Sequence, residues 1–494
     1  MNLFVHLTYL APIVAAIGVL LGLPARRTAV IAALVALGSA LIVFLGYDRA
    51  QAGYQFASAL PLVANWDLKF FVGVDGLSAT LLLLTSIVQL AAVWLAPKVD
   101  YGENRYYACI LLIAAGAAGA FASLDLFFFY AFHELALIPT FLMIGIWGSG
   151  NRQSAAWKIT IYLSIGSIIL LVGLIGLYLL PPLQNRTFDI VKLQQLAAAS
   201  HGVFAGPGSK SVYLLLLIGF GILVSLFPFH TWAPQAYASA PVPVAMLHAG
   251  VLKKFGLYGL LRVALPLMPE AARHWAAFLL ILLAGNILYV GLATISQKQL
   301  DLTLGYSSVM HMGYIFLGIA SYNVIGLNGA ALLMLAHGLS IAALFAMCGE
   351  IRKQTGTLNY LDLGGLGTSM PTLCFVFGLA TFASIGLPGF ANFASELLVF
   401  FGAFKHSTPG AGFNEFQVVG TIALWGVVIS SVYMLRAYRA IFMGERQARW
   451  QSVKDMPIDL GWAVILLVAA LLIVGLLPRT VLDAIEPGIR LFAK

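Results

Sequence analysis

The stretch PFHTWAPQAYASAPVPVAMLHAGVLKKFGLYGLLR, residues 228–262, places two adjacent lysines in the middle of an otherwise apolar segment. A lysine at the centre of a bilayer helix costs roughly 2.5 to 3.5 kcal/mol on translocon scales, so it usually faces a protein interior or a water path. A single lysine could snorkel from a helix end, but Arg262 follows Lys253 and Lys254 and is the better candidate for the membrane interface. The pair therefore indicates ion or proton handling inside a membrane domain.

The composition places the chain among polytopic membrane proteins. Of its 494 residues, 61% are hydrophobic and 9% are charged, and the mean hydropathy is +0.95. Apolar runs of the roughly 20 residues needed to cross the hydrocarbon layer recur from end to end. These values exclude a water-soluble globular protein and leave no soluble domain for a nucleotide, flavin or iron–sulfur site, so no cofactor is expected in this chain.

The cysteines and the net charge exclude two further classes. Cys109, Cys348 and Cys374 lie far apart in apolar segments and form neither a disulfide framework nor a metal-ligand spacing. The net charge of +8 comes mostly from basic residues in short loops, where they set topology. No basic stripe is present for a polyanion, so nucleic acid is not an expected partner.

The apolar runs predict an all-α fold that crosses the membrane about fourteen times. The first run, 3–23, has Arg26 and Arg27 after it and no basic residue before it, so we expect a retained helix with its N-terminus outside rather than a signal peptide. Both ends then lie on the outer face, and no lateral helix is expected before Lys494. Further spans are predicted at about 28–46, 76–97, 106–123, 125–148, 157–180, 212–230, 240–264, 275–295, 302–321, 327–350, 371–401, 416–443 and 461–479.

Two aspartates at predicted helix starts favour a structural role. The stretch FFVGVDGLS, 70–78, is predicted to be a loop that opens a helix with Asp75, and Asp125 stands at the start of a later span. A side chain at such a position usually caps the helix, which is worth about 1 kcal/mol.

Glu134 lies about nine residues into a predicted span, where a carboxylate is expensive unless it is paired or neutralised. Pro139, one turn later, frees a backbone carbonyl that can bind a buried carboxyl group or water. His133 points about 100° away from Glu134, so only one of them can face a given seam directly. Glu134 is the preferred candidate for the seam that contains the lysines, and His133 is the weaker one.

Prolines interrupt two predicted spans at corresponding places. Pro228 lies in the seventh span, and Leu387, Pro388 and Gly389 lie in the twelfth, followed by Glu396 in mid-membrane. Broken helices at matching positions of two halves are typical of an inverted repeat with the functional site at the breaks.

His311 and His337 lie on neighbouring predicted spans and are flanked by small residues. Either could be an ordinary core histidine, but neutral imidazole can both accept and donate a proton and is therefore suited to a relay. The ionisable residues of the spans form a polar axis through the membrane domain, which suits proton transfer between half-channels. They are Glu134, Lys253, Lys254, His311, His337 and Glu396.

Motifs along nearly the whole chain carry a family resemblance. The chain resembles the antiporter-like proton-pumping subunits of respiratory complex I, most closely subunit M (subunit 4), whose partners are other membrane-arm subunits. The motifs are FFVGVDGLS at 70–78, DLFFFYAFHELALIPTFLMIGIWG at 125–148, PFHTWAP at 228–234, LHAGVLKKFGLYGLLR at 247–262, GYSSVMHMGY at 305–314, AHGLS at 336–340 and GLPGFANFASELLVFF at 386–401.

The resemblance implies fourteen helices with two inverted five-helix repeats, here at about 106–265 and 275–443, between N-terminal helices at 1–105 and a last helix within 444–494. It places the family's fifth-helix glutamate on Glu134, its central lysine on Lys254, its eleventh-helix histidine on His337 and its twelfth-helix carboxylate on Glu396.

The chain departs from the family pattern at the seventh helix and near two loops. Leu223 replaces the lysine that usually pairs with the fifth-helix glutamate, and Ser225 replaces a proline. Either that pairing is lost, or Lys253, where the family generally has an apolar residue, supplies the charge. The inner-side loop reads QKQLDLTL at 297–304 instead of QxDxKRL, which predicts an altered charge contact, and Gln235 and Tyr237 stand where acid and histidine are common.

The sequence thus predicts a proton-translocating membrane-arm subunit of a complex-I-like NADH (or ferredoxin)-quinone oxidoreductase, multi-pass in the inner (cytoplasmic) membrane. NAD, flavin, iron–sulfur clusters and quinone would lie in partner subunits. One alternative is an Mrp-type cation/proton antiporter subunit, or a subunit of a membrane-bound hydrogenase or an inorganic-carbon-uptake complex. The other is a non-pumping scaffold subunit.

Overall fold

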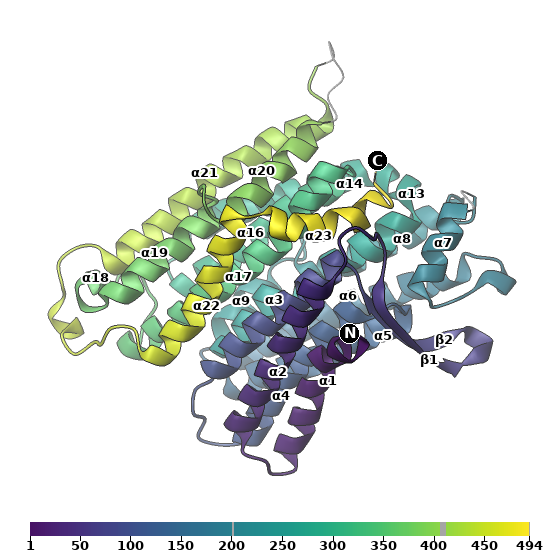
Figure 1. Ribbon diagram of the computed structural model, residues 1–494. Coiled ribbons are helices and arrows are strands. Elements are labelled where there is room, and N and C mark those ends of the chain that lie inside the picture. The colour runs from purple at the N-terminus through teal and green to yellow at the C-terminus, as the bar shows by residue number, and fades with distance from the viewer. Residues whose placement is uncertain (200–201, 406–411, 494) are drawn as a thin grey trace.

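The computed structural model describes residues 1–199, 202–405 and 412–493, and most of them are helical (Figure 1). The first part of the chain forms α1 Asn2–Leu20, α2 Ala25–Gly46, α3 Gly76–Trp94, α4 Glu103–Ala122, α5 Leu126–Trp147, α6 Arg152–Leu179, α7 Ile190–Ala199, α8 Pro207–Val224 and α9 Trp232–Ser239. The second part forms α13 Pro269–His274, α16 Leu300–Ala320, α17 Val324–Thr355, α18 Leu366–Ser369, α19 Pro371–Ile385, α20 Ala391–Phe404, α21 Glu415–Phe442, α22 Ile458–Leu476 and α23 Arg479–Arg490.

Two further helices contain π-helical turns. The segment Val242–Leu267, here called the lysine helix, consists of α10 Val242–Leu247, a π turn His248–Leu252, α11 Lys254–Gly259, a π turn Leu260–Ala264 and α12 Leu265–Leu267. The helix Ala276–Ile295 consists of α14 Ala276–Ala284, a π turn Gly285–Val290 and α15 Gly291–Ile295.

Twelve helical segments in the described part are long and apolar enough to cross a membrane. The two interrupted spans predicted from the sequence are each a pair of short helices: α8 and α9 around 225–231, and α19 and α20 around 386–390. If each pair counts as one crossing, the total equals the fourteen predicted spans; the number of crossings and the repeat relation stay predictions.

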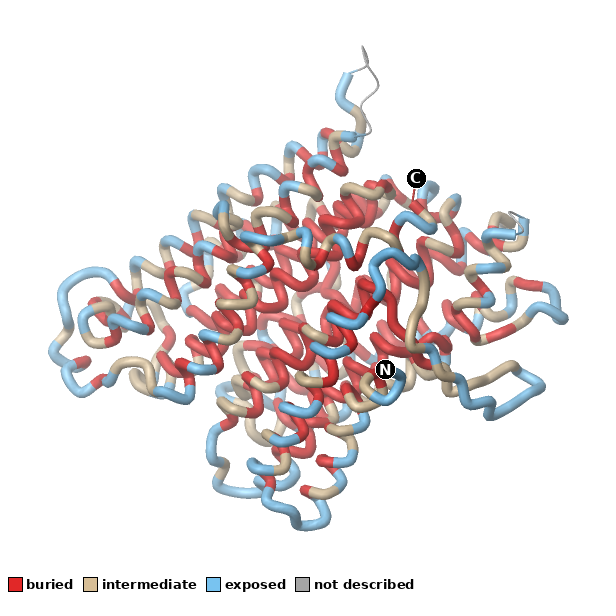
Figure 2. The backbone as a smooth tube through the Cα atoms, viewed as in Figure 1, coloured by how far each residue is buried: buried red, intermediate tan, exposed pale blue. Residues whose placement is uncertain are grey.

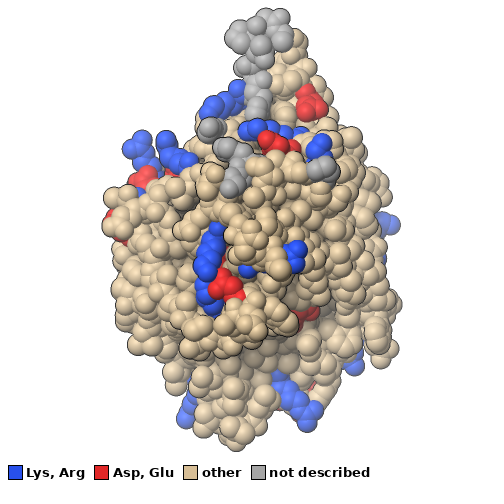
Figure 3. All heavy atoms as spheres, turned by 90° about the vertical axis from the view of Figure 1, so that its right-hand side faces the viewer, with Lys and Arg blue, Asp and Glu red and all other residues tan. Residues whose placement is uncertain are grey.

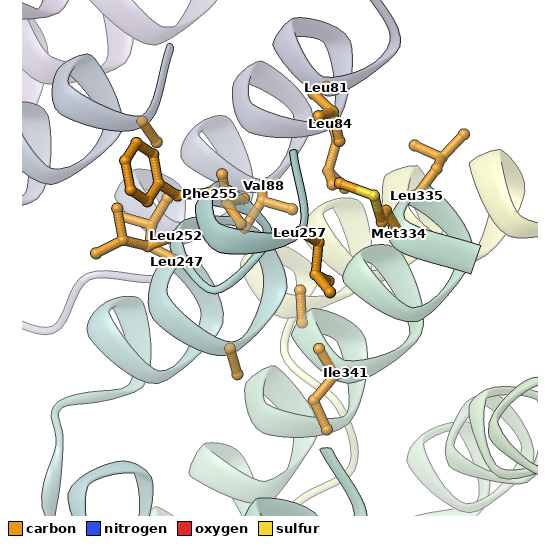
Figure 4. Packing of buried hydrophobic residues seen from close by; sticks show 14 of the residues in the cluster. Leu81, Leu84, Val88, Leu247, Leu252, Phe255, Leu257, Met334, Leu335 and Ile341 are labelled. Atoms are coloured by element: carbon orange, nitrogen blue, oxygen red, sulfur yellow. The ribbon is translucent and has the colours of Figure 1, made fainter. Parts of the chain in front are cut away.

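The lysine helix and α17 form the centre of the molecule. The best 18-residue window of each is entirely buried, and Figure 2 shows buried segments running through the middle of the bundle with exposed ones outside. Leucines and a methionine of α3, α17 and the lysine helix interlock in this core, as Figure 4 shows for Leu84, Met334 and Leu257. The polar side chains of the centre are therefore held in a closely packed apolar surrounding.

Two glycines let the central helices touch. A Cβ atom on Gly338 of α17 would lie 2.6 Å from the carbonyl oxygen of Gly250, and one on Gly250 would lie 3.0 Å from the carbonyl oxygen of Gly338. Only glycine permits this backbone approach. It brings the helix with Lys254 against the helix with His337.

A β-hairpin precedes α3 and was not predicted. Strands β1 Gln55–Val63 and β2 Leu68–Val74 pair antiparallel, with Ala59 opposite Phe71. The prediction of a loop at 70–78 was therefore wrong for its first half. Aromatic and β-branched residues in β2 favour a strand, and Figure 1 shows the hairpin projecting from the helical body.

An ion-pair cluster ties the hairpin to the segment that leads into α7. Lys69 Nζ lies 3.1 Å from Asp67 and 3.2 Å from Asp189, and Lys192 Nζ lies 2.8 Å from Asp67. Partial burial raises the pKa of Asp67, but hydrogen bonds from Lys192, Thr187 and Lys69 outweigh it, so the pKa lies below its ordinary value. The contribution of this carboxylate is present at neutral pH and is lost as the pH falls through its folded-state pKa.

Both predicted capping roles are confirmed. Asp75 accepts a hydrogen bond from the Ser78 amide in a capping box, and Asp125 accepts from the amides of Phe127 and Phe128. Asp75 also forms an ion pair with Arg262, which is only 6% exposed. This carboxylate holds Arg262 inside the protein, and its position at the membrane interface stays a prediction.

A lateral helix follows the last predicted span, contrary to the sequence-based expectation. Helix α23 crosses the ends of α3 and α17 (Figure 1). A Cβ atom on Gly76 would overlap the carbonyl group of Ala484, and Gly488 lies beside Asp75. The first turn of α3 is therefore the docking site of α23.

We expect Gly76→Ala to release α23 from this site, because the added methyl group meets backbone that cannot move without displacing the helix. Trypsin should then cleave after Arg479 about tenfold faster, as expected when a local opening becomes easier by about 1.4 kcal/mol. Gly38→Ala is the control, because no atom lies within 4 Å of its added Cβ. Equal cleavage of both variants would contradict this account.

Candidate functional site

Lys253 and Lys254 follow directly on a π turn in the middle of the lysine helix and are 1% and 0% exposed. A π turn inserts one residue into the helical register and is frequent at functional sites. Here it directs two successive side chains toward different neighbours. The prediction that both lysines lie inside the protein is therefore confirmed.

Lys254 reaches α17. Its Nζ atom donates a hydrogen bond to the carbonyl oxygen of Ala249 at 2.7 Å and lies 3.0 Å from Nδ1 of His337. An ammonium group has only donors, so a charged Lys254 requires Nδ1 to accept and places the ring proton on Nε2. A proton can pass between these two groups without a change in backbone structure.

Lys253 reaches α16 and α9. Its Nζ atom donates to Ser308 Oγ at 3.3 Å and lies 5.5 Å from the centre of the Tyr237 ring. The Tyr237 hydroxyl is 3.2 Å from Nδ1 of His248. Among the described residues, no carboxylate forms an ion pair with Lys253 or Lys254, so their charge is balanced only by neutral dipoles and an aromatic face.

His311 connects His337 to the second broken helix. The centres of the two imidazole rings are 5.5 Å apart. Nδ1 of His311 lies 2.8 Å from the Ser307 carbonyl oxygen and Nε2 lies 2.9 Å from the Ser384 carbonyl oxygen. Both partners are acceptors, so both bonds form together only when the ring carries two protons. The structure thus brings Lys254, His337 and His311 into one row.

Glu396 lies beside the break between α19 and α20. Its side chain is buried, and a Cβ atom on Gly386 would lie 2.5 Å from its Oε2 atom. Gly386 has a φ of +82°, which glycine adopts without strain. Within the described part, Glu396 Oε1 has no hydrogen-bond partner. The carboxyl group therefore faces the break, which directly follows the end of α19 that contains Ser384.

Glu134 does not face the lysines. Its carboxylate accepts a hydrogen bond from Ser167 of α6, and 36% of its side chain is exposed. The neighbouring His133 is 2% exposed and stacks on Phe255 of α11, with ring centres 4.0 Å apart. The preference for Glu134 at the lysine seam is thus not matched by the geometry, because the register of α5 turns His133 toward α11.

Leu223 contacts the same helix as Glu134 but provides no charge. A Cβ atom on Gly166 of α6 would lie 3.3 Å from the Leu223 side chain. The described residues place no lysine within ion-pair distance of Glu134, and the basic group that lies there is Nδ1 of His133, 3.9 Å away. Within the described part of the chain, Lys253 therefore forms no ion pair with Glu134.

The first broken helix is bridged by a side chain that the sequence analysis did not single out. Asn286 Nδ2 donates to the carbonyl oxygens of Ser225 and Val309, and Asn286 Oδ1 accepts from the amide of Phe227. The bonds to Ser225 and Phe227 satisfy backbone groups freed by the break, and the bond to Val309 connects Asn286 to α16. Ser308, Ser384 and the ion pair of Asp301 with Arg352 were also missed, since each acts through partners distant in sequence.

The comparison with known families agrees with the helical architecture. Residues 123–416 match the family model described as NADH:quinone oxidoreductase/Mrp antiporter, transmembrane. The chain is 36% identical over 405 residues to NAD(P)H-quinone oxidoreductase chain 4-2 of Synechocystis, which covers 82% of this chain and 70% of that protein.

Two solved structures share the fold. A chain of respiratory complex I from Thermus thermophilus superposes with a TM-score of 0.87 at 29% identity, covering 99% of this chain and 100% of that one. A chain of the Mrp complex from Dietzia superposes with a TM-score of 0.85 at 21% identity, covering 100% of this chain and 98% of that one. The second likeness concerns the fold alone.

Proposed function

Because the chain belongs to the NADH:quinone oxidoreductase/Mrp antiporter family of membrane proteins, we propose that it is a proton-translocating membrane-arm subunit of a complex-I-like oxidoreductase. The observation that carries this proposal is the buried row of Lys254, His337 and His311 on three helices. Each member can hold or release a proton. Lys254 Nζ lies 3.0 Å from Nδ1 of His337, and the ring centres of His337 and His311 are 5.5 Å apart. The row is therefore suited to passing protons through the centre of the molecule.

Lys253 and Lys254 act as the central proton carriers, and His337 and His311 relay protons toward the second broken helix. Glu396, beside that break, accepts protons on the exit side. In this scheme His311 holds the proton between His337 and Glu396, because its two carbonyl partners stabilise the doubly protonated ring.

Glu134 pairs with a cation that another subunit supplies. Its partly exposed carboxylate lies on α5, and α5 and α6 present apolar side chains to the outside, among them Ile138, Ile165 and Ile168. On the face drawn in Figure 3, large uncharged areas surround a central group of basic and acidic side chains, and such areas suit contact with lipid or with other membrane subunits. The hydrogen bond from Ser167 does not neutralise this carboxylate, so a cation from a neighbouring subunit would balance its charge.

The redox chemistry takes place in other subunits, which hold NAD (or use ferredoxin), flavin, iron–sulfur clusters and quinone. The chain lies in the inner (cytoplasmic) membrane with both termini on the outer side. The segments 106–265 and 275–443 form two inverted repeats, between the N-terminal helices of 1–105 and the C-terminal 444–494. The two broken helices support this division, since each is the fourth span of its unit.

The test uses the intact complex in liposomes, with proton uptake driven by NADH or reduced ferredoxin. We expect Lys253→Met to lower proton uptake per electron about tenfold while the complex assembles normally, because methionine can neither bind nor release a proton beside Ser308. Unchanged uptake would mean that Lys253 has not replaced the seventh-helix lysine and that Lys254 is the only central carrier. Uptake of sodium in place of protons would instead support a cation/proton antiporter.

A further inference from the structure

A polar cavity of about 600 Å³ opens at the ends of α9, α16 and α17 that the proposed topology places on the inner side of the membrane. Its lining contains the charged pair Asp301 and Arg352 together with uncharged polar side chains. The latter include Ser149, Asn151, Ser154, Gln235, Gln299 and Thr357. Such a lining can hold water in contact with this partly buried ion pair.

Arg352 joins four segments beside this cavity. From α17 its guanidinium donates to Ser149 Oγ at 2.9 Å and to the carbonyl oxygen of Ala238 at 3.3 Å, and it forms an ion pair with Asp301 of α16. These partners belong to the turn between α5 and α6, to α9 and to α16. One side chain therefore fixes α9 relative to α16 and α17.

The cavity and Lys253 lie along the same face of α16. Asp301 and Ser308 are seven residues apart, which places them on one side of the helix with a rise of about 10 Å between them. Ser308 accepts the hydrogen bond from Lys253. Between them, α9 closes against α16: a Cβ atom on Gly305 would lie 2.8 Å from Cα of Pro234.

We propose that this cavity is the inner-side vestibule from which Lys253 takes up protons, and that the contact between Arg352 and Asp301 holds the passage shut. The inference rests on the proposed function and names the place where its protons enter. When Arg352 releases Asp301 and Ala238, α9 moves away from Gly305 and water reaches Ser308. A hydronium ion then gives its proton to the neutral amine of Lys253 and becomes water.

The test measures access of a reagent to Ser308→Cys in the assembled complex, with Cys109, Cys348 and Cys374 replaced by alanine. The probe is the impermeant anion 2-sulfonatoethyl methanethiosulfonate, applied to either face of sealed vesicles. We expect slow labelling with Arg352 present. In Arg352→Gln the rate from the inner face should rise about tenfold or more, as expected from the loss of a charge-assisted hydrogen bond.

Asp301→Asn is the second variant, because it keeps the shape of the side chain and removes only the ion pair; we expect a rise of about threefold or more. Lys353→Gln is the matched control, since Lys353 is the next residue on α17 and is 73% exposed; its rate should equal that of the parent. Unchanged rates in both test variants, or labelling from the outer face alone, would overturn the proposal. Labelling does not depend on pumping, so a complex that moves no protons would contradict the proposed function and leave this result interpretable.

Discussion

Lys254→Met is expected to abolish proton translocation by the assembled complex, with a loss of about a hundredfold or more in protons moved per electron. Methionine fills a similar volume, but it can neither donate to His337 nor carry a proton. Lys254 also donates to the Ala249 carbonyl at the π turn. The substitution therefore removes two hydrogen bonds, one to this carbonyl and one to the His337 ring. The row from the lysine helix to α17 would be interrupted at its first member.

The measurement is proton uptake into liposomes, with electron transfer recorded separately in the presence of an uncoupler. Lys353→Met on the surface of α17 is the control and should pump like the wild type. A scaffold subunit would tolerate Lys254→Met, so undiminished pumping with the variant chain present would favour that alternative. A joint loss of pumping and electron transfer would show that this chain is tightly coupled to the redox subunits.

The burial of the lysines and the broken helices could be predicted because both leave local signals. A lysine within an apolar run is costly wherever the helix packs, and Pro228 and Pro388 disrupt a helix regardless of its partners. The contact of Lys254 with His337 could not be predicted from the sequence in the same way. It depends on the close approach of Gly250 and Gly338, which come from distant parts of the chain.

The direction of Glu134 could not be predicted from helical spacing, because spacing gives the angle between His133 and Glu134 but not which of them faces inward. The large aromatic ring of Phe255 on α11 offers His133 a stacking partner, and Ser167 on α6 offers Glu134 a donor. Both partners are known only once the helices are placed. The same holds for Arg352, whose partners lie 51 to 203 residues away in sequence.

The β-hairpin and α23 were missed for a different reason. The strands contain Pro61 and few alternating polar residues, so a period of two is hardly visible. Helix α23 is short and contains Pro487, which disfavours a helix on propensity alone. Its amphipathic pattern does not show which surface its apolar face packs against. That surface includes Gly76 at the start of α3, which is known only from the structure.

Arg262→Met is expected to destabilise the fold by about 3–5 kcal/mol, the usual result of leaving one partner of a buried ion pair uncompensated. Asp75 is 1% exposed and would keep only its capping bonds with Ser78. The guanidinium also lies 5.3 Å from the centre of the ring of Tyr54, which directly precedes β1. The substitution therefore also removes this cation–π contact. The effect should exceed that of Gly76→Ala, because here a charge is left in the interior.

The measurement is thermal unfolding of the detergent-solubilised complex, where the midpoint should fall by about 5–10 °C. Adding Asp75→Asn to Arg262→Met should restore part of the loss, because the asparagine removes the unpaired charge and can still cap α3. If the single variant unfolds like the wild type, the ion pair contributes nothing to stability. If Asp75→Asn fails to restore stability, the cost lies in the packing of the arginine stem rather than in charge. Recovery in the double variant would show that the cost of Arg262→Met comes from the unpaired charge of Asp75, which lies beside Gly488 of α23.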